Sequence, residues 1–393
     1  MAVVLWQPPF CFGGFIVKKI LSLILFILII FAGCSEPQEN KETTTNPTTA
    51  TTVPVNPEMT KELDLALSNV NFKGVACIYS NGNKIYEGCK GYANLDKKIK
   101  NSPQGTYRIG SLSKQFTAVC IGILYEKGEI SLDQKLIDFY PECKYGNDVT
   151  IKSLLNMTAG IPDYSCSRAD NIQYSNDDLG FEISPSSKED NIKNIEEFIL
   201  NQTPQKVEKG SYDYSNSNYF LLGRIIEKIS NTDYEVFVKE NILEPLNMKS
   251  TSFEQIDLTS TGYYKGENEF EVLKEFNQEW TLYPRAFFAN ADMITSVDDL
   301  FRWYSALKNN EIISQNTFDI LTQNSSSGFG MGLITDNSIV YFINGHIGAY
   351  TSFLGFSKTD DFAVITLSNH FSDDVNYNNI GVKLGNIAMK YQS

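Results

Sequence analysis

Residues 107–118 read YRIGSLSKQFTA, which places Ser111 three positions before Lys114 at the start of a helix expected over 112–127. At that spacing the two side chains lie on one helix face. A serine hydroxyl is a poor nucleophile until a base removes its proton, and a lysine shielded from water can have its pKa lowered enough to act as that base. Ser–Lys pairs are a variant of the serine triad. The segment therefore predicts a nucleophile with its base beside it.

The spacing alone is weak evidence, because Ser305 and Lys308 repeat it and such pairs usually lie on a solvated helix face. A second element supplies context, since the triplet Tyr214-Ser-Asn216 directly precedes a strongly helical run over residues 219–230. The same triplet type also begins elsewhere, at Tyr79, Tyr145, Tyr174 and Tyr377. Only the copy at position 214 is followed directly by such a helix.

A third element, GHIGAY at residues 345–350, combines glycines with one of the two histidines of the chain. Glycine at the start of a strand lets backbone approach a ligand closely. Taken alone, His346 reads as a hydrogen-bonded structural histidine, and a substrate contact is the alternative.

The order of the expected elements indicates the fold class. Residues 73–94 read as two β-rich runs around Asn81-Gly82, a strong hairpin signal. Helical patterns fill the middle of the chain, over 112–127, 151–157, 195–200, 218–230, 234–241 and 297–308. Strand patterns return over 339–343, 350–357 and 362–368, before a last amphipathic helix over 380–391. Because distant strands must pair to bury their apolar faces, we expect an α+β fold: one antiparallel sheet from both chain ends, flanked by helices, with a mostly helical lobe inserted.

Composition argues against two classes of partner. The 393 residues carry 33 Lys+Arg against 47 Asp+Glu, a net charge of −14, so we expect no nucleic-acid partner. Two histidines and no Cys-x-x-Cys pair argue against a metal site, and no cofactor is implied. We assign no disulfide to the cysteines of the expected domain, which are Cys77, Cys89, Cys120, Cys143 and Cys166.

The first 33 residues read as an export signal peptide. Lys18 and Lys19 precede an apolar run over residues 20–32, which is shorter than the ~20 residues that a membrane-spanning helix needs. The run ends in FAGC, which resembles a bacterial lipoprotein box with Cys34 as the lipidated first residue of the mature chain. Residues 1–16 do not fit a signal peptide, which favours a translation start at Val17.

Residues 34–57 have the Thr-, Pro- and Asn-rich composition of an unfolded tether, and the folded domain is expected over residues 58–393. We therefore expect an exported lipoprotein of the cell envelope that contacts the membrane only through its lipid anchor. Its oligomeric state is left open.

Ordered blocks between residues 73 and 368 together resemble the family of class C serine β-lactamases, DD-peptidases and related esterases and D-aminopeptidases. The blocks are YRIGSLSKQFTA, LLNMTAGIPDY, YDYSNSNYFLLGRIIEKIS, ILEPLNMKST, ADMITSVDDLFRW, GHIGAYTSFLGFS and VITLSN. The resemblance implies the β-lactamase/transpeptidase-like fold. It also implies that Ser111 is the acylated nucleophile, that Lys114 activates it, and that Tyr214 carries the proton between Ser111, the leaving group and the deacylating water.

The resemblance further assigns a substrate-binding group. Asn216 would bind the amide of the substrate, and His346 stands where β-lactamases have the lysine of a Lys-Thr-Gly triad. Gly348 and Ala349 follow it, and the backbone N–H of Ala349 would form the oxyanion hole with that of Ser111. Because free imidazole is mostly neutral at pH 7, His346 removes a permanent positive charge, which favours an ester or amide other than a β-lactam.

Three functions remain open. The first is an extracytoplasmic serine hydrolase that cleaves a small-molecule or peptide-like substrate through an acyl-enzyme. The second keeps the fold but makes the protein a penicillin-binding or wall-fragment sensor without turnover. The third, a solute-binding lipoprotein, would need two alternating βα halves, which the pattern does not offer. Substrate selectivity is expected to lie in loops such as 166–190 and 259–284.

Overall fold

The computed structural model describes residues 56–165, 179–183, 187–204, 211–254, 257–264, 271–272, 285–323, 329–330, 332–335, 340–372 and 377–392. The predicted signal peptide, Cys34 and most of the predicted tether lie outside these residues, as do large parts of the two selectivity loops. Within the described part of the chain, no helix is both long and apolar enough to cross a membrane.

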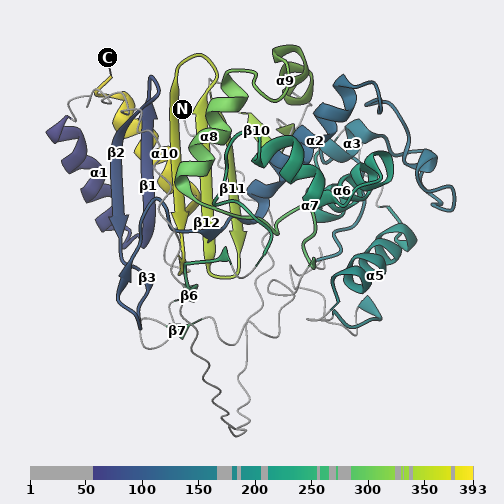
Figure 1. Cartoon of the computed structure of the whole chain (residues 1–393), viewed down its shortest axis with the longest axis horizontal. Helices are drawn as coiled ribbons and strands as arrows, with labels where there is room; N and C mark the ends of the chain where they lie inside the picture. Colours follow the sequence, from purple (N-terminus) through teal and green to yellow (C-terminus); the bar gives the residue numbers. More distant parts are fainter. Residues whose placement is uncertain are drawn as a thin grey trace, which may run out of the picture.

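A seven-stranded antiparallel sheet joins the two ends of the chain (Figure 1). The strand order is β2-β1-β13-β12-β11-β10-β9. Strand β1 pairs with β13 along its whole length, from Gly74↔Ser368 to Ser80↔Phe362, which confirms the predicted sheet. The strands are β1 (Gly74–Ser80), β2 (Asn83–Lys90), β9 (Phe329–Gly330), β10 (Leu333–Thr335), β11 (Val340–Ile347), β12 (Tyr350–Ser357) and β13 (Phe362–Ser368).

Two tight turns order the strands. Asn81 and Gly82, at φ of 50° and 72°, make the predicted two-residue turn between β1 and β2. The turn between β11 and β12 has Gly348 at φ 56°. The sequence pattern predicts that β11 ends at residue 343, whereas the strand continues through His346 to Ile347. Pairing with β12 overrides the low strand propensity of the Asn-Gly-His run.

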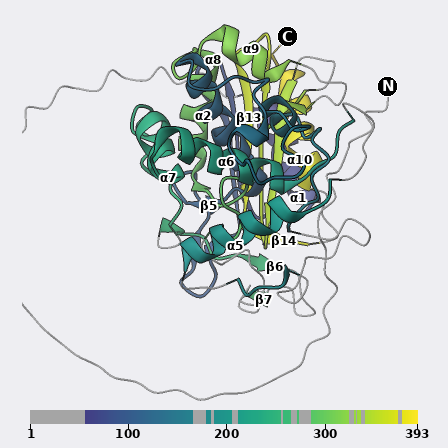
Figure 2. The same cartoon turned by 90° about the vertical axis from the view of Figure 1, so that its right-hand side faces the viewer.

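The sheet lies between two helical layers. Helices α1 (Pro57–Asn69) and α10 (Tyr377–Met389) cover one face, and α8 (Val297–Lys308) lies on the other (Figure 2). Side chains alternate along β1, so that Ala76 and Ile78 pack toward α1 and α10 while Val75 and Cys77 pack toward the larger core. Helix α1 includes Pro57, the last residue of the predicted tether, because the Asn56 side chain accepts from the first free backbone N–H groups.

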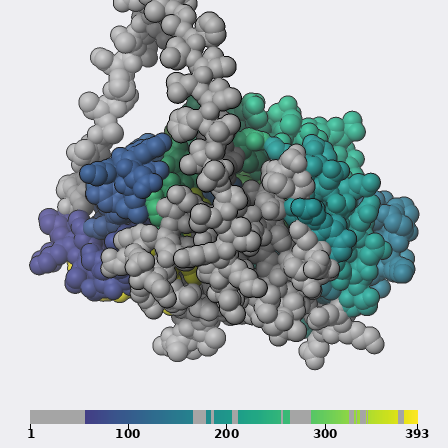
Figure 3. All heavy atoms as spheres, turned by 90° about the horizontal axis from the view of Figure 1, so that it is seen from below, coloured from purple at the N-terminus to yellow at the C-terminus, as the bar shows by residue number. Residues whose placement is uncertain are grey.

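The remaining helices form the predicted helical lobe, which lies at the end of the molecule opposite α1 (Figure 3). They are α2 (Lys114–Glu126), η2 (Leu136–Asp138), α3 (Ile151–Leu155), α5 (Lys188–Asn201), α6 (Asn216–Ser230), α7 (Tyr234–Val238), the π-helix η3 (Lys239–Leu243) and α9 (Gln315–Thr322). Short strands complete the described elements: β3 (Tyr92–Asn94) with β4 (Ile99–Lys100), β5 (Tyr107–Arg108) with β8 (Ile294–Thr295), and β14 (His370–Phe371) with β6 (Tyr263–Tyr264) and β7 (Glu271–Val272).

Candidate active site

Ser111 lies in the 3₁₀ turn η1 (Gly110–Ser113), which runs directly into α2. Strand β5 immediately precedes the turn and pairs with β8. The backbone around Ile109 is tied on two sides, because its N–H donates to the Met293 carbonyl at 3.1 Å and its carbonyl accepts from the Ser352 hydroxyl at 2.7 Å. Strand β12 of the main sheet and the segment that leads into β8 therefore fix the position of Ser111 together.

Two glycines allow η1 and β11 to approach each other closely. Gly110 has φ 52°, and a Cβ on it would lie 2.7 Å from the backbone nitrogen of His346. A Cβ on Gly345 would lie 1.8 Å from the carbonyl oxygen of Ile109. Gly345 thus makes room for the backbone of Ile109. The close contact between the two segments places His346 beside the turn that carries Ser111.

We expect Gly110→Ala to destabilise the fold by about 2–4 kcal/mol, because it combines positive-φ strain with a steric clash. Gly128→Ala is the matched control, since Gly128 has φ 72° but a Cβ on it would meet no atom within 4 Å. That variant should lose only about 1 kcal/mol. Urea unfolding midpoints of both variants measure the difference, and equal losses would contradict the close approach of η1 and β11.

Four of the predicted site residues form one hydrogen-bonded cluster. The Ser111 hydroxyl lies 2.7 Å from the Tyr214 hydroxyl and 3.1 Å from Lys114 Nζ. Lys114 Nζ also donates to Asn216 Oδ1 at 2.8 Å and to the Asn290 carbonyl at 3.0 Å. Helix α6 begins at Asn216 because the Ser215 side chain caps it, which places Tyr214 just before the helix. The structure therefore brings together residues that are about one hundred positions apart in the chain.

The electrostatics of the cluster make a neutral Lys114 accessible near pH 7. Burial lowers the pKa of Lys114 to about 7, against the opposing effect of the Asp163 and Asp292 carboxylates. The position of Lys114 at the positive end of α2 acts in the same direction as burial. Burial also raises the pKa of Tyr214 well above its usual range, so that this phenol keeps its proton at neutral pH. Lys114 is therefore the better candidate for the base.

The three partners of Lys114 Nζ determine where its lone pair points. An ammonium group has three donors, and here they go to Ser111, Asn216 and Asn290. The Asn216 amide oxygen and the Asn290 carbonyl can only accept, so a neutral amine keeps its two N–H groups directed at them. Its lone pair then faces the Ser111 hydroxyl, which is the geometry that proton abstraction needs.

The predicted substrate-binding residues lie at the end of β11 and in the following turn. His346 is half-buried, and its ring lies 4.6 Å from that of Phe371. Burial lowers the pKa of His346 to about 4, although a backbone hydrogen bond with Gly348 opposes this. Ala349 is fully buried directly before β12. Their roles at the substrate, and the oxyanion hole, stay predictions.

The structure also separates the two Ser-x-x-Lys matches. Ser305 and Lys308 lie on α8, where Lys308 is exposed and forms an ion pair with Asp361 at 3.3 Å. Lys114, by contrast, is completely buried. The second match therefore has the solvated lysine expected of an ordinary helix face.

Sequence reasoning missed two contributors to the cluster, Asp163 and Asn290. Asp163 accepts from both the backbone N–H and the side-chain amide of Asn216, at 3.0 and 3.1 Å. Asn290 offers its carbonyl from a loop in which Arg285 and Asp292 pair at 2.8 Å. The one signal in the sequence was the aspartate of LLNMTAGIPDY, a single acidic residue within an otherwise uncharged block.

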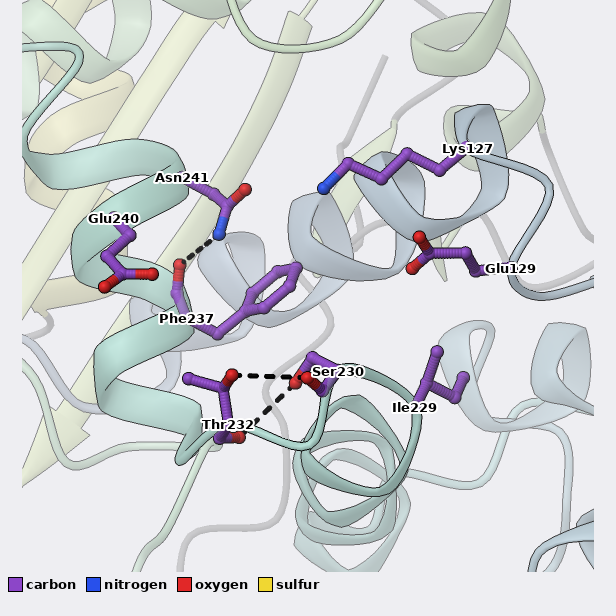
Figure 4. A pocket seen from close by; sticks show the side chains of 8 residues that line it. All are labelled: Lys127, Glu129, Ile229, Ser230, Thr232, Phe237, Glu240 and Asn241. Atoms are coloured by element: carbon purple, nitrogen blue, oxygen red, sulfur yellow. Dashed lines mark hydrogen bonds between the residues drawn. The ribbon is translucent and has the colours of Figure 1, made fainter.

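A hollow of about 560 Å³ lies between the ends of α2, α6 and α7 (Figure 4). It is lined by Lys127, Glu129, Ile229, Ser230, Thr232, Phe237, Glu240 and Asn241. None of the predicted site residues lines it, and the length of α2 separates it from Lys114 by roughly 20 Å. Within the described residues, no group of three or more His, Cys, Asp or Glu side chains is placed to hold a metal ion.

Comparison with known proteins gives a consistent result. The chain is 27% identical over 317 residues to protein flp of Staphylococcus aureus, a match that covers 76% of this chain and 59% of flp. It is 29% identical over 308 residues to the putative penicillin-binding protein PbpX of Bacillus subtilis, a match that covers 77% of this chain and 72% of PbpX. The chain thus spans about three fifths of the length of flp.

Solved structures show the same fold. The D-amino acid amidase of Ochrobactrum anthropi SV3, complexed with D-phenylalanine, superposes with a TM-score of 0.72 at 21% identity, over 87% of this chain and all of that one. The Beta-lactamase family model matches residues 66–386. This confirms the predicted β-lactamase/transpeptidase-like α+β fold, and the chain belongs to the beta-lactamase family.

Proposed function

We propose that this protein is a serine hydrolase that cleaves an ester or amide bond of a peptide-like or D-amino-acid substrate through an acyl-enzyme on Ser111. The observation that carries the proposal is the position of Lys114 Nζ, buried and 3.1 Å from the Ser111 hydroxyl. Three comparisons support it: membership of the beta-lactamase family, similarity to a putative penicillin-binding protein, and a fold shared with a D-amino acid amidase. Export and lipid anchoring through Cys34 remain predictions.

The chemistry follows from the hydrogen bonds of the cluster. Neutral Lys114 takes the Ser111 proton while the serine oxygen forms a bond to the substrate carbonyl carbon, giving a tetrahedral intermediate. Tyr214 donates its proton to the leaving alcohol or amine as the old bond breaks, and is reprotonated from Lys114. Water then attacks the acyl-enzyme with its proton passing to the same residues, and Ser111 regains its hydrogen.

The state of His346 bears on the substrate class. With a pKa of about 4, this residue is neutral across the physiological range and offers no cation to a substrate carboxylate. We therefore propose a substrate that is uncharged at the group facing β11, rather than a carboxylate-bearing β-lactam.

We expect the ratio of kcat/KM for a carboxylate-bearing ester over its neutral methyl ester to stay constant between about pH 5.5 and 8. The ratio should stay constant because a His346 pKa of about 4 leaves the imidazole neutral throughout this range. The measurement is paired kinetics of both esters in His346→Gln and in the parent protein. A ratio that changes near pH 6.5 in the parent alone would contradict a neutral His346.

An alternative within the same fold is a sensor that is acylated without turnover. The similarity to a putative penicillin-binding protein is the observation that favours it. Retention of the complete Ser111, Lys114 and Tyr214 cluster counts against it, because a sensor does not need a route for deacylation.

One experiment separates the two functions. The purified protein is incubated in parallel with a p-nitrophenyl ester, a D-alanyl p-nitroanilide and a chromogenic cephalosporin, and both the burst and the steady state are recorded. We expect turnover of the ester or the anilide, with weaker hydrolysis of the cephalosporin. A stoichiometric burst without turnover would support the sensor, and no reaction with any of the three would contradict the hydrolase.

A further inference from the structure

Asp163 is a buried carboxylate next to the reactive cluster. Both of its oxygens accept hydrogen bonds, and all four donors belong to Ser165 and Asn216. Its Oδ1 accepts from the backbone N–H and the hydroxyl of Ser165, at 2.8 and 2.6 Å. Its Oδ2 accepts from the backbone N–H and the side-chain amide of Asn216, at 3.0 and 3.1 Å. Asp163 is only 5% exposed, and none of the ion pairs among the described residues involves it.

This carboxylate differs from the other one near Lys114. Asp292 is also buried, but Arg285 lies 2.8 Å from it and neutralises it. The charge of Asp163 is compensated only by neutral donors, so it acts on its surroundings as a net negative charge. The hydrogen bonds of Asp163 connect it to one cationic group, Lys114: the Asn216 amide donates to Asp163 and accepts from Lys114.

The orientation of the Asn216 amide is determined at both ends. A carboxylate can only accept and an ammonium group can only donate, so the amide nitrogen must face Asp163 and the amide oxygen must face Lys114. The second amide hydrogen goes to the Ser165 hydroxyl at 3.1 Å. Both N–H groups of Asn216 therefore already have acceptors within the protein, and a substrate carbonyl would have to displace one of them.

We propose that Asp163 is a positioning residue that locks the Asn216 amide with its oxygen on Lys114, so that the carboxylate, the amide and the amine work as one unit. Asn216 then orients the base through its amide oxygen. The inference rests on the proposed function, because it assigns a role within the same reaction.

The unit makes the reaction sensitive to the charge of Asp163. The titratable and charged groups around Lys114 are the rings of Tyr214 and Tyr219, and the carboxylates of Asp163 and Asp292. A negative charge stabilises the ammonium form, so its removal makes the neutral amine available at lower pH. The same change puts an amide nitrogen in place of one acceptor oxygen of Asp163, so the Asn216 amide is held less firmly and Lys114 is placed less accurately.

The test is fluorophosphonate labelling of Ser111 as a function of pH in Asp163→Asn, which keeps the shape of the side chain and removes its charge. We expect the acid limb of the labelling rate to move down by about 0.5–1 pH unit, and the plateau rate to fall about tenfold to a hundredfold. Asp64→Asn is the matched control, because Asp64 lies on α1 and pairs with Lys90 away from the cluster. It should change neither quantity.

A double-mutant cycle distinguishes positioning from a general effect on folding. In an Asn216→Ala background, Asp163→Asn should add no further loss of plateau rate, whereas an independent structural role would add its full effect. If Asp163→Asn does not fold, Ser165→Ala takes its place, with a few-fold loss of plateau rate expected because one amide hydrogen loses its acceptor.

The outcomes separate this inference from the function beneath it. A parent protein that is not labelled at Ser111 would overturn the proposed function and this inference with it. A labelled parent together with an unchanged pH profile and plateau in Asp163→Asn, or an unchanged plateau in Ser165→Ala, would overturn the inference alone.

Discussion

Ser111→Ala should abolish labelling by a fluorophosphonate probe and reduce ester hydrolysis by at least about 10⁴-fold, because no acyl-enzyme can form without the nucleophile. The loss should appear in kcat, since the change removes one oxygen atom and leaves the binding surface in place. Labelling intensity on a gel and steady-state kinetics with a p-nitrophenyl ester measure it. The thermal midpoint should stay close to that of the parent, because the Ser111 side chain is only partly buried.

The chain contains a matched control for this variant. Ser305→Ala removes the same atom from the second Ser-x-x-Lys sequence, on α8, where Lys308 is paired with Asp361. We expect full labelling and full activity in that variant. Equal labelling of Ser111→Ala and the parent would show that another residue is the nucleophile.

Lys114→Met should reduce the rate of acylation by about 10³-fold, because it removes the base and fills the same space with an apolar chain. Lys114→Arg should be equally inactive, since a guanidinium keeps the donors but is not deprotonated in proteins. Burst kinetics with a p-nitrophenyl ester measure both. An active Lys114→Arg would mean that the positive charge, and not the base, is what Ser111 requires.

The parent protein should show the titration of this base. With a pKa of about 7, Lys114 is half neutral near pH 7, and the neutral fraction falls tenfold for each pH unit below that. The burst rate should therefore rise with pH up to about 7 and then level off. A burst rate that is independent of pH between 5 and 8 would contradict a lysine base, and the residual rate of Lys114→Met should lack this acid limb.

Local pattern was sufficient to predict several features of the site. Helical periodicity alone puts Ser111 and Lys114 on one face, and the Asn81-Gly82 turn and the strands at both ends predict the sheet that β1 and β13 form. These features depend on residues close together in the chain, or on the general need of strands to pair, which is why they are readable without coordinates. The family resemblance then added Tyr214 and Asn216.

Other features depend on segments that meet only in the folded chain. The burial that lowers the pKa of Lys114, its third partner Asn290, and the hold of Asp163 on Asn216 involve residues 50 to 180 positions apart. The contact between Gly110 and β11 is of the same kind.

The sequence by itself determined the class of the fold and predicted Ser111 as the nucleophile with Lys114 beside it, because hydrophobic periodicity and short motifs are properties of local chain geometry. Only the tertiary structure decided which Ser-x-x-Lys pair is buried, how far burial lowers the pKa of its lysine, and which groups orient it. Those properties follow from desolvation and hydrogen bonding, and both depend on which distant segments exclude water from a side chain and which atoms they leave facing it.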